Sequence, residues 1–131
     1  MLKMNMTHYW IEKSSFNLNV KTLSENAKGP ISISPDFKRD IIELDGDNAI
    51  VKISIIIKQT DSIPFDIDVV VCGSFNCERW KESDEGQSFI KYTSVQILFP
   101  YLRQAVATIT GMANIPQYVL PVINVKELFK D

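Results

Sequence analysis

The sequence predicts an α+β fold in which helices pack on one face of an antiparallel β-sheet. The first half of the chain contains runs in which apolar and polar residues alternate, and the last third contains apolar residues at helical spacing. Strands that precede helices along the chain, instead of alternating with them, are typical of this class. A chain of 131 residues has the usual size of one domain, so residues 1–131 are expected to form a single unit.

The strands are predicted from alternation with a period of two residues. The clearest run is 65–75, in which the odd-numbered positions are mostly apolar, and residues 50–58 alternate in the same way. Residues 9–20 form another expected strand, whose apolar positions change from odd to even near Ser14, which predicts a β-bulge there. A short strand is expected over 41–44, before the turn residues Asp-Gly-Asp-Asn.

Two stretches are expected to be irregular. Residues 21–40 contain Gly29, Pro30 and Pro35 and form a long crossover between the first two strands, and loops of this length are usually functional. Residues 76–87 are polar and charged and lead into the helical sequence.

The helix is predicted over residues 98–110. Pro100 suits its first turn, and Gly111 suits the position just after its end. A proline-bounded apolar segment and a short terminal turn follow. The apolar positions that form one face of this helix are Leu98, Tyr101, Leu102, Ala105, Ile109 and Met112.

Composition excludes several functional classes. The net charge is −2 with a pI near 5.4 and no basic cluster, which argues against nucleic-acid binding. No apolar run reaches the roughly 18 residues that a membrane helix needs, and the N-terminal sequence lacks signal-peptide features, so a cytoplasmic protein without membrane contact is expected. Cys72 and Cys77 have opposite parity on one strand, which favours free thiols, and two Cys with one His disfavour a zinc site.

No residue pattern indicates catalysis, so the chain is expected to be neither an enzyme nor dependent on a cofactor. The five glycines are not clustered as a phosphate-binding loop requires. His8 has no nucleophile motif around it, and Asp66 and Asp68, on one strand face, are better explained as a solvated surface than as an acid–base pair.

The last third of the chain also carries an ordered set of motifs. These are Leu-Phe-Pro-Tyr-Leu-Arg at 98–103, Gly111, Ile-Pro-Gln-Tyr at 115–118 and Pro-Val-Ile-Asn-Val-Lys-Glu-Leu-Phe at 121–129. Together they resemble the end of the SecB family of protein-export chaperones. The resemblance extends more weakly to Gly-Ser-Phe at 73–75 and to Asp-Phe at 36–37, where the family carries Asp-Trp. It implies a four-stranded antiparallel sheet with a long crossover loop, helices on one face, and assembly as a dimer of dimers.

The resemblance implies an ATP-independent holdase that binds unfolded or newly made polypeptides. Two alternatives stay open: a dedicated chaperone of a single client, such as an antitoxin in a toxin–antitoxin system, and a non-chaperone adaptor that binds a folded partner. The implied client groove lies between the sheet, the crossover and the C-terminal elements. For Phe65 and Phe75 an ordinary core position is the competing interpretation, and for Phe37 it is local packing. The candidate groove residues are Phe37, Phe65, Phe75, Tyr118 and Phe129.

Two further surfaces are expected. In export-specific members acidic residues on the sheet dock the translocase motor SecA. Here Asp68 occupies one such position, whereas Ser15 and Asn19 replace two others, which puts an export role in doubt. The helix is expected to form a homo-oligomer interface, although covering its own sheet is an equal alternative. The candidate interface residues are Leu98, Tyr101, Ala105 and Thr108.

Overall fold

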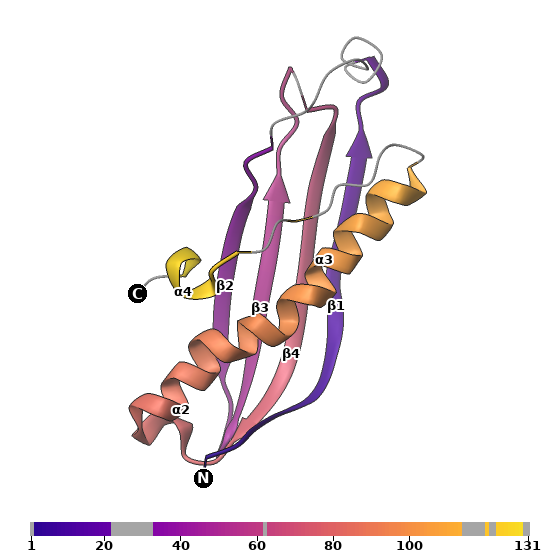
Figure 1. Ribbon diagram of the computed structural model, residues 1–131. Coiled ribbons are helices and arrows are strands. Elements are labelled where there is room, and N and C mark those ends of the chain that lie inside the picture. Colours follow the sequence, from indigo (N-terminus) through magenta and orange to yellow (C-terminus); the bar gives the residue numbers. More distant parts are fainter. Residues whose placement is uncertain (1, 22–32, 62, 114–119, 121–122, 130–131) are drawn as a thin grey trace.

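The computed structural model describes residues 2–21, 33–61, 63–113, 120 and 123–129. Four antiparallel strands form one sheet in the order β1-β4-β3-β2, so β1 and β2 are the edge strands (Figure 1). The predicted α+β class is confirmed. The elements are β1 (Met4–Leu18), β2 (Asp36–Glu43), β3 (Asn48–Ile57), β4 (Phe65–Cys77), the 3-10 helix η1 (Trp80–Glu82), α2 (Asp84–Ser88), the π-helical turn η2 (Phe89–Thr93), α3 (Ser94–Met112) and α4 (Val125–Leu128).

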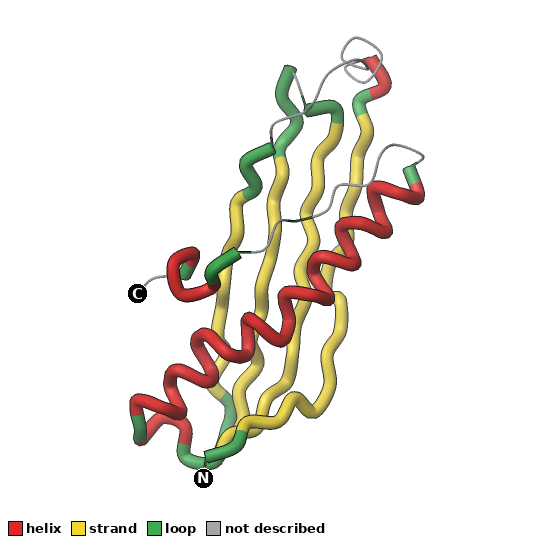
Figure 2. Tube along the Cα trace, viewed as in Figure 1, coloured by secondary structure: helices red, strands yellow, loops and turns green. Residues whose placement is uncertain are grey.

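The helices form a second layer on one face of the sheet. Figure 2 shows α3 running obliquely across the strands, and among the described residues no helix covers the opposite face. The odd-numbered residues of β3 and β4 point toward α3 and are buried, as their alternation predicts. The fully buried side chains that join the two layers include Val51, Ile53, Ile55, Val69, Val71, Phe75, Leu98, Leu102 and Val106.

The uncovered face of the sheet carries ion pairs between strands. Lys13 Nζ lies 2.6 Å from Asp68 Oδ2, joining β1 to β4. Lys52 Nζ lies 2.7 Å from Glu12 Oε1, joining β3 to β1 across β4. The hydrogen bond to Glu12 raises the pKa of Lys52. Cys72 is a free thiol on the central strand of this face, and its burial, together with the charge of Glu12, raises its pKa.

Two strands differ from the expectation. In β1 the pairing with β4 shifts between Met6 and His8 and between Ile11 and Lys13, so the irregularities precede Ser14. β2 begins at Asp36 because its backbone already pairs there with β3, opposite Ile56. Phe37 is therefore a strand residue and not part of the crossover loop.

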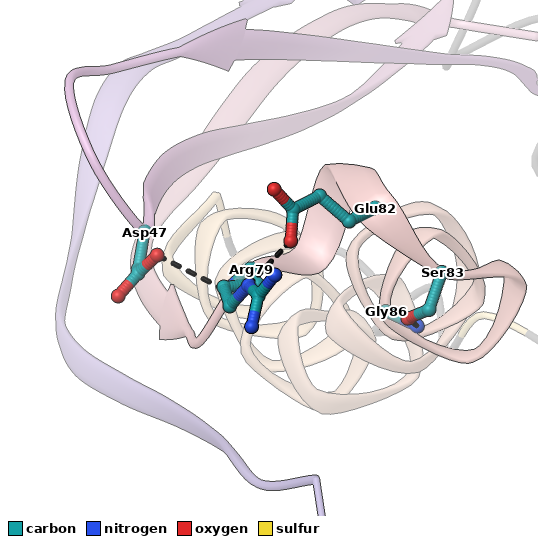
Figure 3. A network of polar contacts seen from close by, with 5 residues as sticks. All are labelled: Asp47, Arg79, Glu82, Ser83 and Gly86. Atoms are coloured by element: carbon teal, nitrogen blue, oxygen red, sulfur yellow. Dashed lines mark hydrogen bonds and ion pairs between the residues drawn. The ribbon is translucent and has the colours of Figure 1, made fainter.

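The helical region begins earlier than its apolar spacing indicated. Ser83 caps α2, since its Oγ accepts a hydrogen bond from the Gly86 N–H at 3.0 Å (Figure 3). Pro100 consequently lies inside α3, where its ring is exposed and the carbonyl one turn earlier can bond to water. Gly111 is also inside α3, and the only glycine with positive φ among the described residues is Gly46.

A polar turn joins β4 to these helices. Arg79 adopts a left-handed conformation (φ 51°, ψ 39°), which reverses the chain between Cys77 and Trp80. The turn is fixed because the Arg79 N–H donates to Asp47 Oδ1 at 3.0 Å and the Arg79 side chain pairs with Glu82 (Figure 3). The chain then folds back so tightly that Gly86 lies against the backbone of Trp80.

Candidate functional site

Aromatic rings and basic side chains alternate where β2, the start of the long helical region and α4 meet. Figure 1 shows α4 beside β2, at the edge of the sheet. We call this surface the aromatic–cationic patch. It comprises Phe37 and Arg39 from β2, Tyr92 from η2, Phe99 and Arg103 from α3, and Lys126 and Phe129 from the α4 region.

Arg39 is the centre of one half of the patch. Its guanidinium carbon lies 5.5 Å from the centre of the Tyr92 ring and 5.3 Å from that of Phe129. Contacts of this length between a guanidinium and an aromatic face are attractive. Arg39 Nη1 also donates to the backbone carbonyl of Lys91 at 2.7 Å. One side chain on the edge strand thus connects the sheet, the helical layer and the C-terminal turn.

The helix is locally widened where Arg39 reaches it. In η2 the N–H of Ser94 bonds to the carbonyl of Phe89, five residues earlier, instead of four. Such single π-helical turns disturb the alignment of the carbonyls and occur frequently at functional sites. Lys91, whose carbonyl accepts the hydrogen bond from Arg39, lies within this turn.

Phe37 and Phe99 form the other half of the patch. Their ring centres are 5.7 Å apart with planes tilted by 45°, a favourable aromatic geometry. The Arg103 guanidinium carbon lies 5.5 Å from the centre of the Phe99 ring, and Arg103 Nε donates to the Leu120 carbonyl at 3.2 Å. Phe37 is half-buried, whereas Phe99 is only 5% exposed, so Phe37 is the ring that offers surface here.

The short helix α4, capped at its N-terminus, positions the C-terminal residues of the patch. Asn124 Oδ1 accepts a hydrogen bond from the Glu127 N–H at 3.2 Å, and Val125 is buried in the core. This anchoring places Lys126 Nζ 5.9 Å from the centre of the Tyr92 ring, on which Arg39 also packs. Phe129, at the end of α4, is half-buried.

The structure separates the predicted groove residues. Phe37 and Phe129 both lie in the patch: Phe37 packs on Phe99, and Phe129 packs on Arg39. Phe65 and Phe75 do not: they are 3% and 0% exposed, because odd-numbered residues of β4 face α3. The expectation that they line a groove is corrected, since they have no surface to offer. Tyr118 lies outside the described residues.

The basic members of the patch were not predicted. Arg39, Arg103 and Lys126 are scattered in the sequence and meet only through the packing of β2, α3 and α4. One local signal was available: Phe37 and Arg39 are two residues apart, so a strand would place them on the same face. That signal was hidden because this segment was expected to be a loop.

A second open surface lies between β1 and α3. It is an apolar groove of about 320 Å³, in which the rings of Tyr9 and Tyr101 stack with centres 4.0 Å apart. Ile11 and Met112 on its walls are 52% and 82% exposed. Of the predicted interface residues, Tyr101, Ala105 and Thr108 line this groove. Leu98 does not, because it is fully buried against the sheet of its own chain.

The surface at which docking of the translocase motor is predicted carries less unpaired negative charge than expected. Asp68 lies on the uncovered face, but its carboxylate is paired with Lys13. Ser15 is the cross-strand neighbour of Asp68, and the side-chain amide of Asn19 donates to Gln59 Oε1 at 2.9 Å.

Within the described part of the chain, no group of three or more His, Cys, Asp or Glu residues could hold a metal ion. None of the described helices is long and apolar enough to cross a membrane.

Comparison with known structures places the fold. A SecB-like chaperone of Mycobacterium tuberculosis, solved in complex with a peptide from the antitoxin HigA1, superposes with a TM-score of 0.69 at 15% identity. The match covers 92% of this chain and 88% of that one. A protein of unknown function from Streptococcus agalactiae superposes with a TM-score of 0.53 at 11% identity, over 93% of this chain and 99% of that one.

Sequence comparison gives a partial relative and a family. An uncharacterised protein of Methanocaldococcus jannaschii is 44% identical over 62 residues, which are 47% of this chain and only 39% of that protein. The family model described as preprotein translocase subunit SecB matches residues 2–131. The motifs of the last third, the four-stranded sheet backed by helices and this match agree, and the chain belongs to the SecB family.

Proposed function

We propose that this protein is an ATP-independent chaperone that holds unfolded or newly made polypeptides at the aromatic–cationic patch. The observation that carries the proposal is the group of half-buried rings, Phe37, Tyr92 and Phe129, beside an edge strand of a SecB-family chain. The similar chaperone of Mycobacterium tuberculosis, whose structure contains an antitoxin peptide, supports a polypeptide as ligand.

The patch can bind without reading a particular sequence. Unfolded chains expose apolar side chains, which gain by contact with aromatic surface. β2 is an edge strand, so its outward backbone groups can pair with an extended peptide laid beside the rings. A protein that binds only the unfolded state shifts the population toward that state by mass action, and this needs no nucleotide.

Two versions of this function differ in the number of polypeptides that the chaperone binds. A general holdase binds many unfolded chains, whereas a dedicated chaperone protects one client, as the antitoxin peptide in the similar structure suggests. A role in export through SecA is less well supported, because Lys13 neutralises Asp68 and the other expected acidic positions are Ser15 and Asn19.

Binding of a permanently unfolded, fluorescently labelled polypeptide tests the proposal. Without nucleotide, we expect a dissociation constant of about 1 μM or lower for the unfolded form, and no binding of the same protein in its native form. Fluorescence anisotropy at constant ionic strength measures both. Equal affinity for the two forms would favour an adaptor that recognises folded surface, and no binding at all would reject the chaperone.

Replacing Phe37 by Ser is expected to weaken binding of the unfolded polypeptide about tenfold, or about 1.4 kcal/mol. The substitution removes the half-buried ring of Phe37, which is the more accessible ring of the Phe37–Phe99 pair. Ile42→Ser is the matched control, because Ile42 is an apolar residue of the same strand, 41% exposed on the opposite face of the sheet. An unchanged affinity of Phe37→Ser would remove this ring from the site.

We also propose that a second copy of the chain covers the groove between β1 and α3, which gives a homo-oligomer. Ile11, Met112 and Tyr9 are exposed there beside an edge strand, and such surfaces are normally covered. Ala105→Glu would place a charge in this groove and is expected to halve the mass measured by sedimentation. Gln96→Glu, which adds the same charge to an exposed position of α3 outside the groove, should leave the mass unchanged.

A further inference from the structure

We propose that Asp45, in the turn between β2 and β3, is a site of spontaneous isomerisation to isoaspartate, and that the product loosens the contact of this turn with the start of the helical region. The site is independent of the proposed chaperone function, because only the chemistry of one turn is involved. It is identified by the glycine that follows Asp45 and by the hydrogen bonds of the turn.

The reaction is an attack of the Gly46 backbone nitrogen on the side-chain carboxyl carbon of Asp45. A bond forms between this nitrogen and Cγ, and the carboxyl OH leaves as water with the proton of the nitrogen, which gives a succinimide ring. Water then opens the ring at the backbone carbonyl of Asp45, so that the main chain continues through Cβ and Cγ. The water released in the first step is replaced in the second, and the reaction needs no enzyme, oxidant or metal ion.

The residue after Asp45 makes this attack sterically possible. Asp45 is the only aspartate of the chain that precedes a glycine, and no asparagine precedes one. Any other residue would carry a Cβ beside the attacking nitrogen. Gly46 has a φ of 70°, and a Cβ at this position would have no other atom within 4 Å, so the surroundings of the turn are open. Both residues are exposed.

Among the described residues, neither reacting group is held by a hydrogen bond. The Gly46 N–H has no acceptor in this part of the chain, and the Asp45 carboxylate has no donor or cation there. The backbone carbonyl of Asp45, by contrast, receives a long contact of 3.4 Å from Asn48 Nδ2. This donor polarises the carbonyl that water attacks when the ring opens toward isoaspartate.

Asp47, in the same turn, is the internal comparison. Its Oδ1 accepts a hydrogen bond from the Arg79 N–H at 3.0 Å, and its backbone carbonyl accepts one from the Cys77 N–H at 3.0 Å. Figure 3 shows its carboxylate directed at Arg79. The next residue, Asn48, carries a side chain. We therefore expect Asp47 to react much more slowly than Asp45.

Isomerisation would lengthen a turn that the structure holds at both ends. The product adds one methylene group to the main chain, between Leu44 and Asn48, whose N–H and carbonyl close the turn with a hydrogen bond of 3.1 Å. Asp47 lies in this turn and fixes the start of the helical region through the Arg79 N–H. Because both contacts would be weakened, we expect the modified chain to melt about 4 °C lower.

Incubation of the full chain at 37 °C in neutral buffer tests the site. Isoaspartate is quantified by methylation with an isoaspartyl methyltransferase and located by electron-transfer mass spectrometry. We expect it at position 45 and not at position 47, at a rate within about tenfold of the rate in the same chain unfolded in urea. The modified and unmodified chains are then separated by chromatography and compared by thermal unfolding.

Two variants of Asp45 serve as controls. Asp45→Glu should stop the reaction, because the longer side chain would have to form a larger, less favourable ring. Asp45→Asn should give the same isoaspartate faster, with release of ammonia, because nitrogen attacks a neutral amide more readily than a carboxylate.

Three outcomes would overturn the proposal or one of its parts. If Asp45→Asn reacts and the unsubstituted chain does not, the carboxyl group of Asp45 does not reach Gly46 and the site is rejected. Equal amounts of product at positions 45 and 47 would show that the hydrogen bonds of the turn do not control the reaction. An unchanged melting temperature of the modified chain would reject the effect on the helical region.

Discussion

Replacing Leu98 by Ala is expected to lower the free energy of unfolding by about 3 kcal/mol, within the range of about 2–5 kcal/mol seen for buried leucines. Leu98 is 0% exposed and lies between α3 and the sheet, directly over Gly73 of β4. The lost methyl groups leave a cavity that the two rigid layers cannot close. Urea denaturation followed by circular dichroism measures the change.

The surroundings of Leu98 provide the controls. Leu44→Ala removes the same atoms from a leucine that is 38% exposed, and it should cost less than about 1 kcal/mol. A Cβ at Gly73 would lie 2.9 Å from Leu98 Cδ2 and 2.7 Å from Phe75 Cε2, so Gly73→Ala alone is expected to destabilise. Because the cavity relieves the first of these collisions, the double variant should be about 1 kcal/mol more stable than the sum of the single effects. Strict additivity would show that Leu98 does not pack on Gly73.

Replacing Gly86 by Ala is expected to lower the free energy of unfolding by about 2 kcal/mol, against the trend for helices. Helix propensity alone would favour alanine by about 1 kcal/mol. At position 86, however, a Cβ would lie 2.6 Å from both the Cα and the carbonyl oxygen of Trp80. These are backbone atoms, held by the turn at Arg79, so they cannot move aside as a side chain could.

Thermal unfolding of the Gly86→Ala and Glu85→Ala variants would test this steric argument. Glu85 is exposed in the same short helix, so Glu85→Ala should change stability by no more than about 0.5 kcal/mol. A gain of stability in Gly86→Ala would mean that propensity dominates and that α2 can move away from Trp80.

The central strands could be predicted from sequence because one physical requirement determines their pattern. β3 and β4 each bury every second side chain under α3, so Val51, Ile53, Val69 and Val71 repeat with a period of two. The edge strands lack this constraint. β2 begins at Asp36 because its backbone pairs there with β3, and the residue types at the start of β2 do not indicate this pairing.

The start of the helical region was missed for a different reason. Residues 84–97 are amphipathic only in part, and the π-helical turn η2 shifts the helical phase between α2 and α3, so a single 3.6-residue period does not fit. The cap was readable: Ser83 is followed by Asp84 and Glu85, which is the usual composition of a helix N-terminus. Giving weight to that signal would have placed the start correctly.

The candidate site was predictable only in its aromatic part. The family resemblance implies a groove bounded by the crossover, where Phe37 is expected, and by the C-terminal elements, which include Phe129, and the structure brings both rings to one surface. The cations depend on tertiary packing: Arg39 meets Tyr92 and Phe129 only when β2, η2 and α4 are assembled. Phe65 and Phe75 show the opposite error, since an aromatic on a buried strand is most often core.

The ion pairs on the uncovered face also disfavour incorrect registers of the edge strand β1 against β4. A slip of β1 by one residue would turn its side chains to the opposite face. Lys13 would then point under α3 and lose Asp68, and Glu12 would lose Lys52 across β4. The misaligned chain would thus have to desolvate a lysine in the apolar layer. In a long strand with few buried residues such as β1, these pairs therefore add to the specificity of the alignment although they contribute little to the stability of the finished fold.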